Sequence, residues 1–87
     1  MSDVIDNKAD SRFEISVDGA MAIAEYRIDG DTIYFTHTET ADALQGKGVA
    51  SKLIRAALTS AKERGLKIVP RCSFVADYLA KHPEFRS

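Results

Sequence analysis

Two glycines and a lysine stand directly before an amphipathic segment, in the order Gly46-Lys47-Gly48. Glycine loses much conformational freedom on folding, so two of them at the entrance to a helix need a reason. One reason is a turn that requires positive φ. The other is a loop whose bare amides approach an anion at the positive end of the helix dipole, an arrangement that binds phosphate. The segment is a candidate phosphate-binding loop, with a purely structural turn as the alternative.

Two well-known phosphate-binding motifs do not match this loop. A Walker loop requires GxxxxGK[ST], and no such string occurs in the chain. A dinucleotide fingerprint requires GxGxxG, but Ser51 stands where its third glycine should be. The chain is also too short for the doubly wound sheet that carries the fingerprint. A different type of loop must explain the glycines.

Hydrophobic periodicity predicts the strands before the loop. Apolar residues alternate with polar ones over 12–17, 20–28 and 32–39, which is the period of a strand with one buried face. Turn residues separate these segments, so we expect an antiparallel meander of three strands. In the third strand, period two places four residues on one face: Ile33, Phe35, His37 and Glu39.

The period changes after the loop. Apolar residues recur at helical spacing from Val49 to Ala61, and we expect Gly65 to end this helix in a left-handed conformation. A strand over 66–72 and a short helix over 73–82 follow. The expected order is therefore β-β-β-α-β-α, an α+β fold.

In this fold the antiparallel β-meander precedes a β-α-β crossover and a C-terminal helix. Such a crossover is right-handed, so the last strand should run parallel to the third. Pro70 has no amide donor, which predicts that its strand lies at the sheet edge or diverges from its neighbour. We expect a single domain over 11–87 and a flexible N-terminal segment over 1–10, in which Val4 and Ile5 could start a short strand.

The composition is that of an ordinary globular protein: 45% of the 87 residues are hydrophobic, and the net charge is −1. No basic excess indicates nucleic acid, and no apolar run approaches the ~18 residues that cross a membrane. The single cysteine excludes an internal disulfide, from which we expect a reducing, cytoplasmic location. We expect no bound metal, and a monomer or weak dimer because Pro70 disfavours pairing at the edge strand.

A third loop motif does match. Gln45, Gly48 and Ala50 fit Q/R-x-x-G-x-G/A, with "HTE" before the loop, "AKERGLKIVPRCSFV" after it and "HPEF" near the end of the chain. On these residues, and over roughly 11–86, the chain resembles the GNAT N-acetyltransferase superfamily. Within it, the chain looks like the minimal single-domain GNAT-like branch, which carries a lone cysteine on the last strand. The resemblance implies a truncated GNAT fold.

The resemblance also implies binding of acetyl-CoA (coenzyme A) and transfer of its acetyl group to an amine, either a small amine or a protein lysine or N-terminus. In GNAT proteins this loop holds the pyrophosphate, and the pantetheine arm lies between two diverging strands. The cofactor-binding residues implied here are Thr38, Gln45, Gly46, Lys47, Gly48, Val49, Ala50 and Ser51. Positive charge for the phosphates is expected from Lys47, Lys52 or Arg55.

Three residues are candidates for catalysis. His37 and Glu39 could act as bases toward the amine. The resemblance places Cys72 beside the acetyl group as a nucleophile, whereas a lone cysteine is otherwise usually a small buried hydrophobe. Many family members carry a tyrosine that protonates the leaving thiolate, but Ala80 stands at that position, with Tyr78 on another face of the helix.

Several functions therefore stay open at the level of sequence. The acetyl group could pass directly to the amine or through a thioester on Cys72. The chain could instead be a non-catalytic module that binds CoA or acyl-CoA. A scaffold domain without a ligand is the weakest reading, in which the glycines serve only the turn.

Overall fold

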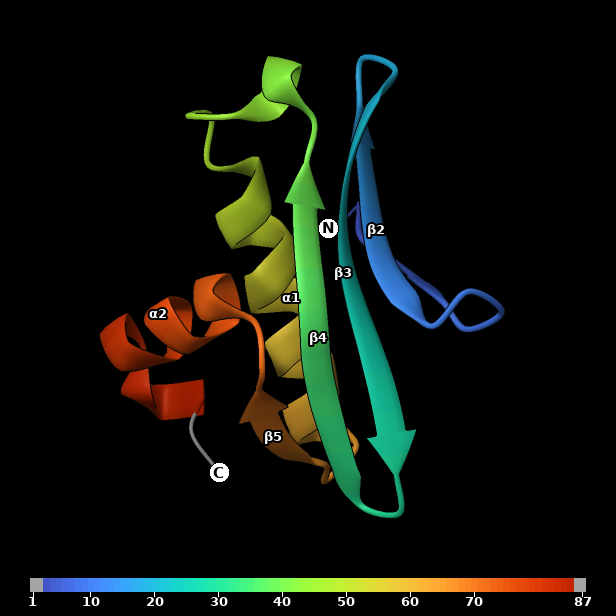
Figure 1. Ribbon diagram of the computed structural model, residues 1–87, viewed down its shortest axis with the longest axis vertical. Helices are drawn as coiled ribbons and strands as arrows, with labels where there is room; N and C mark the ends of the chain where they lie inside the picture. The colour runs from blue at the N-terminus through green and yellow to red at the C-terminus, as the bar shows by residue number, and fades with distance from the viewer. Residues whose placement is uncertain (1–2, 86–87) are drawn as a thin grey trace.

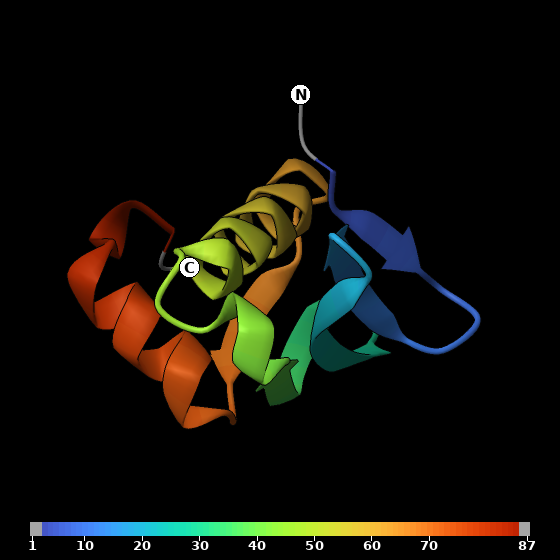
Figure 2. The ribbon, with the colours of Figure 1, turned by 90° about the horizontal axis from the view of Figure 1, so that it is seen from above.

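The computed structural model describes residues 3–85, which form one mixed sheet, a long helix across one of its faces and a shorter helix beyond one edge (Figure 1). The strands are β1 (Ile5–Asn7), β2 (Arg12–Val17), β3 (Ala20–Asp29), β4 (Thr32–Thr40) and β5 (Lys67–Pro70). The helices are α1 (Val49–Glu63) and α2 (Ser73–Lys81), with short 3-10 turns at Asp42–Leu44 and Pro83–Phe85. Seen from above, α2 lies beside α1 and next to β5 (Figure 2).

The strand order across the sheet is β1-β2-β3-β4-β5. The pairs β1–β2, β2–β3 and β3–β4 are antiparallel. The pair β4–β5 is parallel, as the crossover predicted. The predicted α+β fold is confirmed, with one strand more than expected at its start. Pro70 is the last residue of β5, which lies at the edge of the sheet. Its missing amide therefore costs no hydrogen bond between strands.

The additional strand β1 lies inside the segment 1–10, which we expected to be flexible. It pairs with β2, so this part of the chain belongs to the sheet, although residues 1 and 2 fall outside the description. Only Ile5 of the three residues of β1 is apolar, so the segment has no alternation long enough to predict a paired strand. The sheet therefore starts before residue 11.

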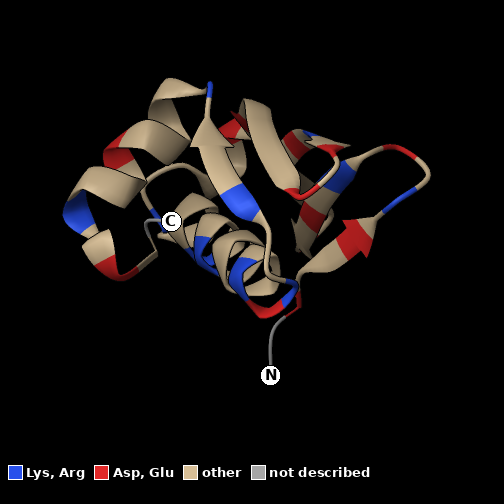
Figure 3. Cartoon of the chain, turned by 90° about the horizontal axis from the view of Figure 1, so that it is seen from below, with Lys and Arg blue, Asp and Glu red and all other residues tan. Residues whose placement is uncertain are grey.

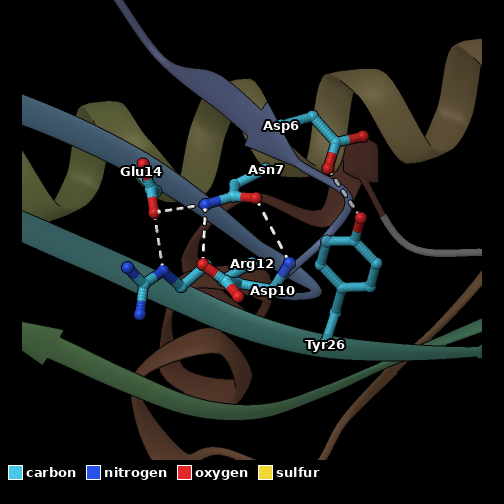
Figure 4. A network of polar contacts seen from close by, with 6 residues as sticks. All are labelled: Asp6, Asn7, Asp10, Arg12, Glu14 and Tyr26. Atoms are coloured by element: carbon cyan, nitrogen blue, oxygen red, sulfur yellow. Dashed lines mark hydrogen bonds and ion pairs between the residues drawn. The ribbon is translucent and has the colours of Figure 1, made fainter.

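Polar contacts hold β1 in place (Figure 4). The Tyr26 hydroxyl donates to Asp6 at 2.6 Å, and the guanidinium of Arg64, just past α1, lies 3.6 Å from the same carboxylate. The Asn7 amide donates to Glu14 at 2.9 Å. Burial raises the pKa of Tyr26 to about 12, and the hydrogen bond to the Asp6 carboxylate adds to the shift.

The core lies between the sheet and the two helices. Alternate residues of β2, β3 and β4 face α1, whose apolar stripe packs onto them. The largest fully buried side chains are Ile15, Ile33, Phe35, Leu53, Ile54, Leu58 and Val75. Gly65 ends α1 with φ +72°, as predicted for a left-handed residue after a helix. Within residues 3–85, no helix covers the other face of the sheet (Figure 2).

A β-bulge interrupts β4. Tyr26 pairs with Phe35, but the preceding residue of β3, Glu25, pairs with His37. Thr36 is therefore the extra residue, and its hydroxyl donates to the Glu25 carbonyl at 3.4 Å. An extra residue exchanges the two faces of a strand for all residues that follow it.

The bulge makes one of our predictions wrong. Ile33 and Phe35 face α1 and are buried, as expected. His37 and Glu39 pair with β3 residues that alternate with its buried alanines, so they lie on the uncovered face. Thr38 takes the α1 side instead. The two candidate bases and the core residues of β4 thus lie on opposite faces.

Candidate functional site

The glycine loop leads from the end of β4 through the 3-10 turn Asp42–Leu44 into α1. Gly46 has φ +76°, and Gly48, the residue that caps α1, has φ +74°. A Cβ added at either glycine would meet no other atom within 4 Å, so the backbone conformation, not crowding, requires glycine here. Both loop glycines are therefore at positions where other residues would be strained.

The Gln45 and Lys47 amides donate within the turn, to the Asp42 and Leu44 carbonyls, but several other amides of the loop have no acceptor in the described part of the chain. The Lys52 amide makes the first bond of α1, to the Gly48 carbonyl at 3.1 Å. Among residues 3–85, no protein acceptor receives the amides of Gly46, Gly48 or the first three residues of α1. The first turn of a helix presents such amides together with the positive end of its dipole, which favours an anion.

A hollow of about 530 Å³ lies against this loop. Its lining residues are Thr38, Thr40, Leu44, Gln45, Gly46, Gly48, Val49, Ala50, Ser51 and Phe74. Seven of the eight predicted cofactor residues are thus brought together, and only Lys47 lies outside the lining. The hollow runs from the loop toward β4 and the start of α2, which suits an elongated ligand with an anionic group at the loop.

Sequence reasoning missed three of these lining residues: Thr40, Leu44 and Phe74. Thr40 was missed because the bulge turns Thr38 and Thr40, and not their neighbours in β4, toward α1 and the hollow. Phe74 is 38% exposed at the first turn of α2. An exposed phenylalanine beside the loop offers apolar contact to a bound chain.

The sulfur of Cys72 lies 3.2 Å from the hydroxyl oxygen of Thr38, which lines the hollow. Pairing of β4 with β5 ends at Phe35 and Pro70, and the two chains then diverge around this contact. Cys72 lies two residues beyond β5 and forms the N-cap of α2, so the lone cysteine is not on the strand itself. It is partly buried and packs against the edge of the core.

Opposing effects act on the pKa of Cys72. Burial raises it, but the Thr38 hydroxyl and the amides of Val75, Phe74 and Thr38 together lower it further, so the pKa lies below its ordinary value. The Val75 and Phe74 amides belong to the first turn of α2, where backbone N–H groups favour the charged thiolate. A cysteine at a helix N-terminus is a common setting for a reactive thiol.

The two candidate bases form their own pair on the uncovered face. His37 Nε2 lies 3.7 Å from Glu39 Oε1, and both side chains are more than half exposed. They can reach a molecule that approaches from solvent. The structure does not bring them into the hollow beside the glycine loop.

Ala80 stands where many family members carry the tyrosine that protonates the leaving thiolate. Ala80 is exposed on α2. Tyr78 is 8% exposed, and its ring stacks on His82 with centroids 4.2 Å apart. Tyr78 is thus part of the core, and no residue replaces the missing tyrosine at this point of the helix.

Positive charge follows the outer side of α1 (Figure 3). Lys52 lies 3.6 Å from Asp3, and the Arg55 guanidinium lies over the Phe85 ring at 5.6 Å. Both residues line a second hollow of about 520 Å³ between α1 and α2, which shares Ser51 and Phe74 with the first. A cationic surface thus continues from the glycine loop, in keeping with a ligand that carries several phosphates.

Neither a metal-binding cluster nor a membrane-spanning helix is found within residues 3–85. No group of three or more His, Cys, Asp or Glu side chains is placed to hold a metal ion. No helix in this part of the chain has the length and apolar character needed to cross a bilayer.

Known proteins resemble this chain in sequence and in fold. The family model of GCN5-related N-acetyl-transferases matches residues 12–87. Protein NATD1 of Xenopus tropicalis is 33% identical over 66 residues, which cover 76% of this chain and 60% of NATD1. Human NATD1 has the same identity, with 58% of its length covered. The chain thus spans less than two thirds of these relatives.

The structural similarity extends over nearly the whole chain. The solution structure of a GCN5-like protein from Staphylococcus aureus superposes with a TM-score of 0.74 and 34% sequence identity. The match covers 98% of this chain and 86% of that one. Together with the family match, it confirms the resemblance carried by the loop motif and its flanks. The chain belongs to the GCN5-related N-acetyltransferase family.

Proposed function

We propose that this chain is an acetyl-CoA-dependent N-acetyltransferase that moves the acetyl group to an amine through a thioester on Cys72. One observation carries the proposal: the hollow against the glycine loop leads to Thr38, whose hydroxyl touches the Cys72 sulfur at 3.2 Å. The loop supplies an anion site, and the thiol supplies a nucleophile within the same region of the molecule.

Two features of the hollow support the binding of CoA. Five amides of the loop and the first turn of α1 have no protein acceptor within the described chain and would donate hydrogen bonds to the diphosphate oxygens: those of Gly46, Gly48, Val49, Ala50 and Ser51. The apolar part of the hollow, toward Phe74, suits the pantetheine arm. When bound, acetyl-CoA supplies the activated acyl group.

Acetylation of Cys72 exchanges one thioester for another. The Cys72 thiolate attacks the carbonyl carbon, a bond from that carbon to Sγ forms, and the bond to the CoA sulfur breaks with release of CoA thiolate. One thiolate enters and one leaves, so the step needs no proton donor. This accounts for an enzyme with Ala80 in place of a tyrosine acid.

The second step consumes the acetyl-cysteine. A neutral amine attacks the acetyl carbon, the carbon–nitrogen bond forms, and the Cys72 thiolate leaves. The amine must lose a proton, which Glu39 or His37 would accept, directly or through water. Their place on the uncovered face suits an acceptor that enters from the side opposite α1.

A non-catalytic module that binds CoA is the second candidate function. The burial of Tyr78 and the presence of Ala80 favour it, because the usual proton donor of the family is missing. The two functions share the hollow and differ in the chemistry at Cys72.

Intact-mass spectrometry after incubation with acetyl-CoA separates these functions. We expect the unsubstituted chain to gain one acetyl group, Cys72→Ala to gain none, and Thr32→Val, on β4 but outside the hollow, to behave like the unsubstituted chain. An acetyl group that persists in Cys72→Ala, or amine-dependent CoA release unchanged by this substitution, would contradict the thioester route. No adduct and no amine-dependent release with any amine would leave the binding module.

A further inference from the structure

A separate hollow of about 500 Å³ lies on the uncovered face of the sheet. Its lining residues are Arg27, Ile28, Asp29, Tyr34, Thr36 and Arg71. Arg27 and Tyr34 are cross-strand partners, and Tyr34 alternates with the buried Ile33 and Phe35, so this hollow faces away from α1. The mechanism above does not use any of these six residues.

Two arginines in this hollow have no acidic partner. Neither Arg27 nor Arg71 belongs to an ion pair among residues 3–85. The Arg71 guanidinium is placed by the Tyr34 ring, 5.1 Å from its centroid, and not by a carboxylate. Asp29 is the one acidic side chain in the lining, so the hollow keeps a net positive charge.

The hollow is joined to the reaction site through the backbone. Arg71 precedes Cys72, and its amide donates to the Phe35 carbonyl at 2.9 Å, the last bond before β4 and the following chain diverge. Successive residues of an extended segment point to opposite sides. Arg71 therefore faces the hollow while Cys72 faces Thr38, with Cα atoms only about 3.8 Å apart.

Thr36 makes the second connection. It is the bulged residue of β4 and lines the hollow, and it is followed directly by His37 on the same uncovered face. The two residues proposed as bases, His37 and Glu39, thus follow the hollow along the same face of β4, although neither lines it.

We infer that this hollow selects an acceptor amine that also carries a carboxylate, which Arg27 and Arg71 bind. The inference rests on the proposed function, and it names the class of acceptor. Guanidinium groups pair with carboxylates through two parallel hydrogen bonds, so they fix both the charge and the orientation of the ligand. With its carboxylate held there, the acceptor directs its amine toward the gap that contains Cys72.

Matched acceptor pairs test this inference. The rate of amine-dependent CoA release is compared for 4-aminobutyrate and 4-aminobutyramide, and for a peptide amide with N-terminal Asp-Glu and its Asn-Gln counterpart. We expect each carboxylate to be preferred in kcat/KM by roughly tenfold or more, since charge-assisted bonds are about twice as strong as neutral ones. The pair with the larger preference tells whether a small amino acid or an acidic N-terminus is the source.

Arginine variants test whether Arg27 and Arg71 cause the preference for acceptors that carry a carboxylate. We expect Arg27→Gln and Arg71→Gln each to lose most of the preference, and Arg27→Lys to keep part of it. Lys67→Gln, which removes a charge from the exposed start of β5 outside the hollow, should keep it in full. All four variants should form the Cys72 adduct without acceptor as the unsubstituted chain does. Equal rates within both acceptor pairs would overturn the inference.

A binding measurement keeps the inference testable if no turnover is found. In 15N-resolved NMR, titration with 4-aminobutyrate should shift the side-chain Nε–H signals of Arg27 and Arg71, and 4-aminobutyramide should not. Unmoved arginine signals would overturn the inference whatever becomes of the thioester. Shifted signals without any Cys72 adduct would support the carboxylate site and contradict only the proposed catalysis.

Discussion

The hydroxyl oxygen of Thr38 on β4 lies 3.2 Å from the sulfur of Cys72, which caps α2, 34 residues later in the chain. This contact bridges the point where β4 and the chain after β5 diverge. It also joins the two parts of the proposed site, because Thr38 lines the hollow at the glycine loop and Cys72 does not. The chemistry that we propose depends on this pair.

Thr38→Val should make Cys72 less reactive. The Thr38 hydroxyl lowers the pKa of the thiol, so its loss raises that pKa and reduces the thiolate fraction at neutral pH. We expect the rate of alkylation by iodoacetamide at pH 7 to fall by roughly three- to tenfold, and its pH profile to move to higher pH. Cys72 is the single cysteine, so the rate reports on it alone.

Thr40→Val is the matched control for this substitution. Thr40 lines the same hollow, but its side chain makes no contact with the sulfur. Its alkylation rate and pH profile should stay as in the unsubstituted chain. An unchanged profile in Thr38→Val would show that the 3.2 Å contact does not activate the thiol.

Gly48→Glu should abolish the stabilisation of the chain by CoA. In the unsubstituted chain, ligand at ~100 times its Kd adds ~2.7 kcal/mol. Each kcal/mol raises Tm by ~4–8 °C for a domain of this size, so we expect a rise of roughly ten degrees or more. The glutamate adds bulk and a negative charge beside the loop amides. Gly30→Glu, with a similar positive φ in the turn between β3 and β4, should lose basal stability but keep the rise with CoA.

Tyr26→Phe should destabilise the fold through β1. The substitution removes the 2.6 Å hydrogen bond to Asp6, and we expect a loss of roughly 1–2 kcal/mol in the free energy of unfolding. Tyr34→Phe is the control, because the Tyr34 hydroxyl makes no hydrogen bond among residues 3–85. Urea denaturation of both variants measures the difference. Equal midpoints would mean that β1 is held by other contacts.

The same tyrosine predicts a dependence of stability on pH. Folding raises the pKa of Tyr26 to about 12 from its ordinary value of 10.0, so folding favours the protonated phenol. Its contribution is present in full below pH 10 and is lost as the pH rises toward 12. We expect Tyr26→Phe to flatten the fall of Tm over this range. A fall as steep as that of the unsubstituted chain would contradict the assignment.

Glu39→Gln should affect the amine-dependent step and leave the first step unchanged. Glu39 lies on the uncovered face, away from the hollow. We therefore expect normal formation of acetyl-Cys72 and a ~100-fold slower loss of the acetyl group to the amine, the size of effect typical of general bases. Single-turnover mass spectrometry resolves both rates. Equal slowing of both steps, or of neither, would contradict the role of this side chain.

Much of the site could be predicted because it lies within one continuous stretch of sequence. The loop from Gln45 to Ser51 joins a strand to a helix, and its glycine spacing reports its backbone conformation directly. The crossover and the edge position of Pro70 follow from chain direction and from a missing amide. These features depend on the residue types and spacing within one segment, which the sequence shows directly.

The bulge at Thr36 could not be predicted in the same way. His37 and Glu39 continue the alternation of Ile33 and Phe35 without a break, so the sequence shows no sign of an extra residue. The shift exists only in the pairing with β3. It decides which face carries the candidate bases and which carries Thr38. Phe74 joined the hollow for a similar reason, because only the packing of α2 beside the loop brings it there.

Titration of the 15N-labelled chain with CoA tests the central claim most directly, because it observes the loop amides themselves. We predict large, saturable shifts for the amides of Gly46, Gly48 and the first turn of α1, with the Gly30 amide unmoved as an internal reference. Loop amides that stay in place at millimolar CoA would contradict the anion site, and with it both the transferase and the CoA-binding module.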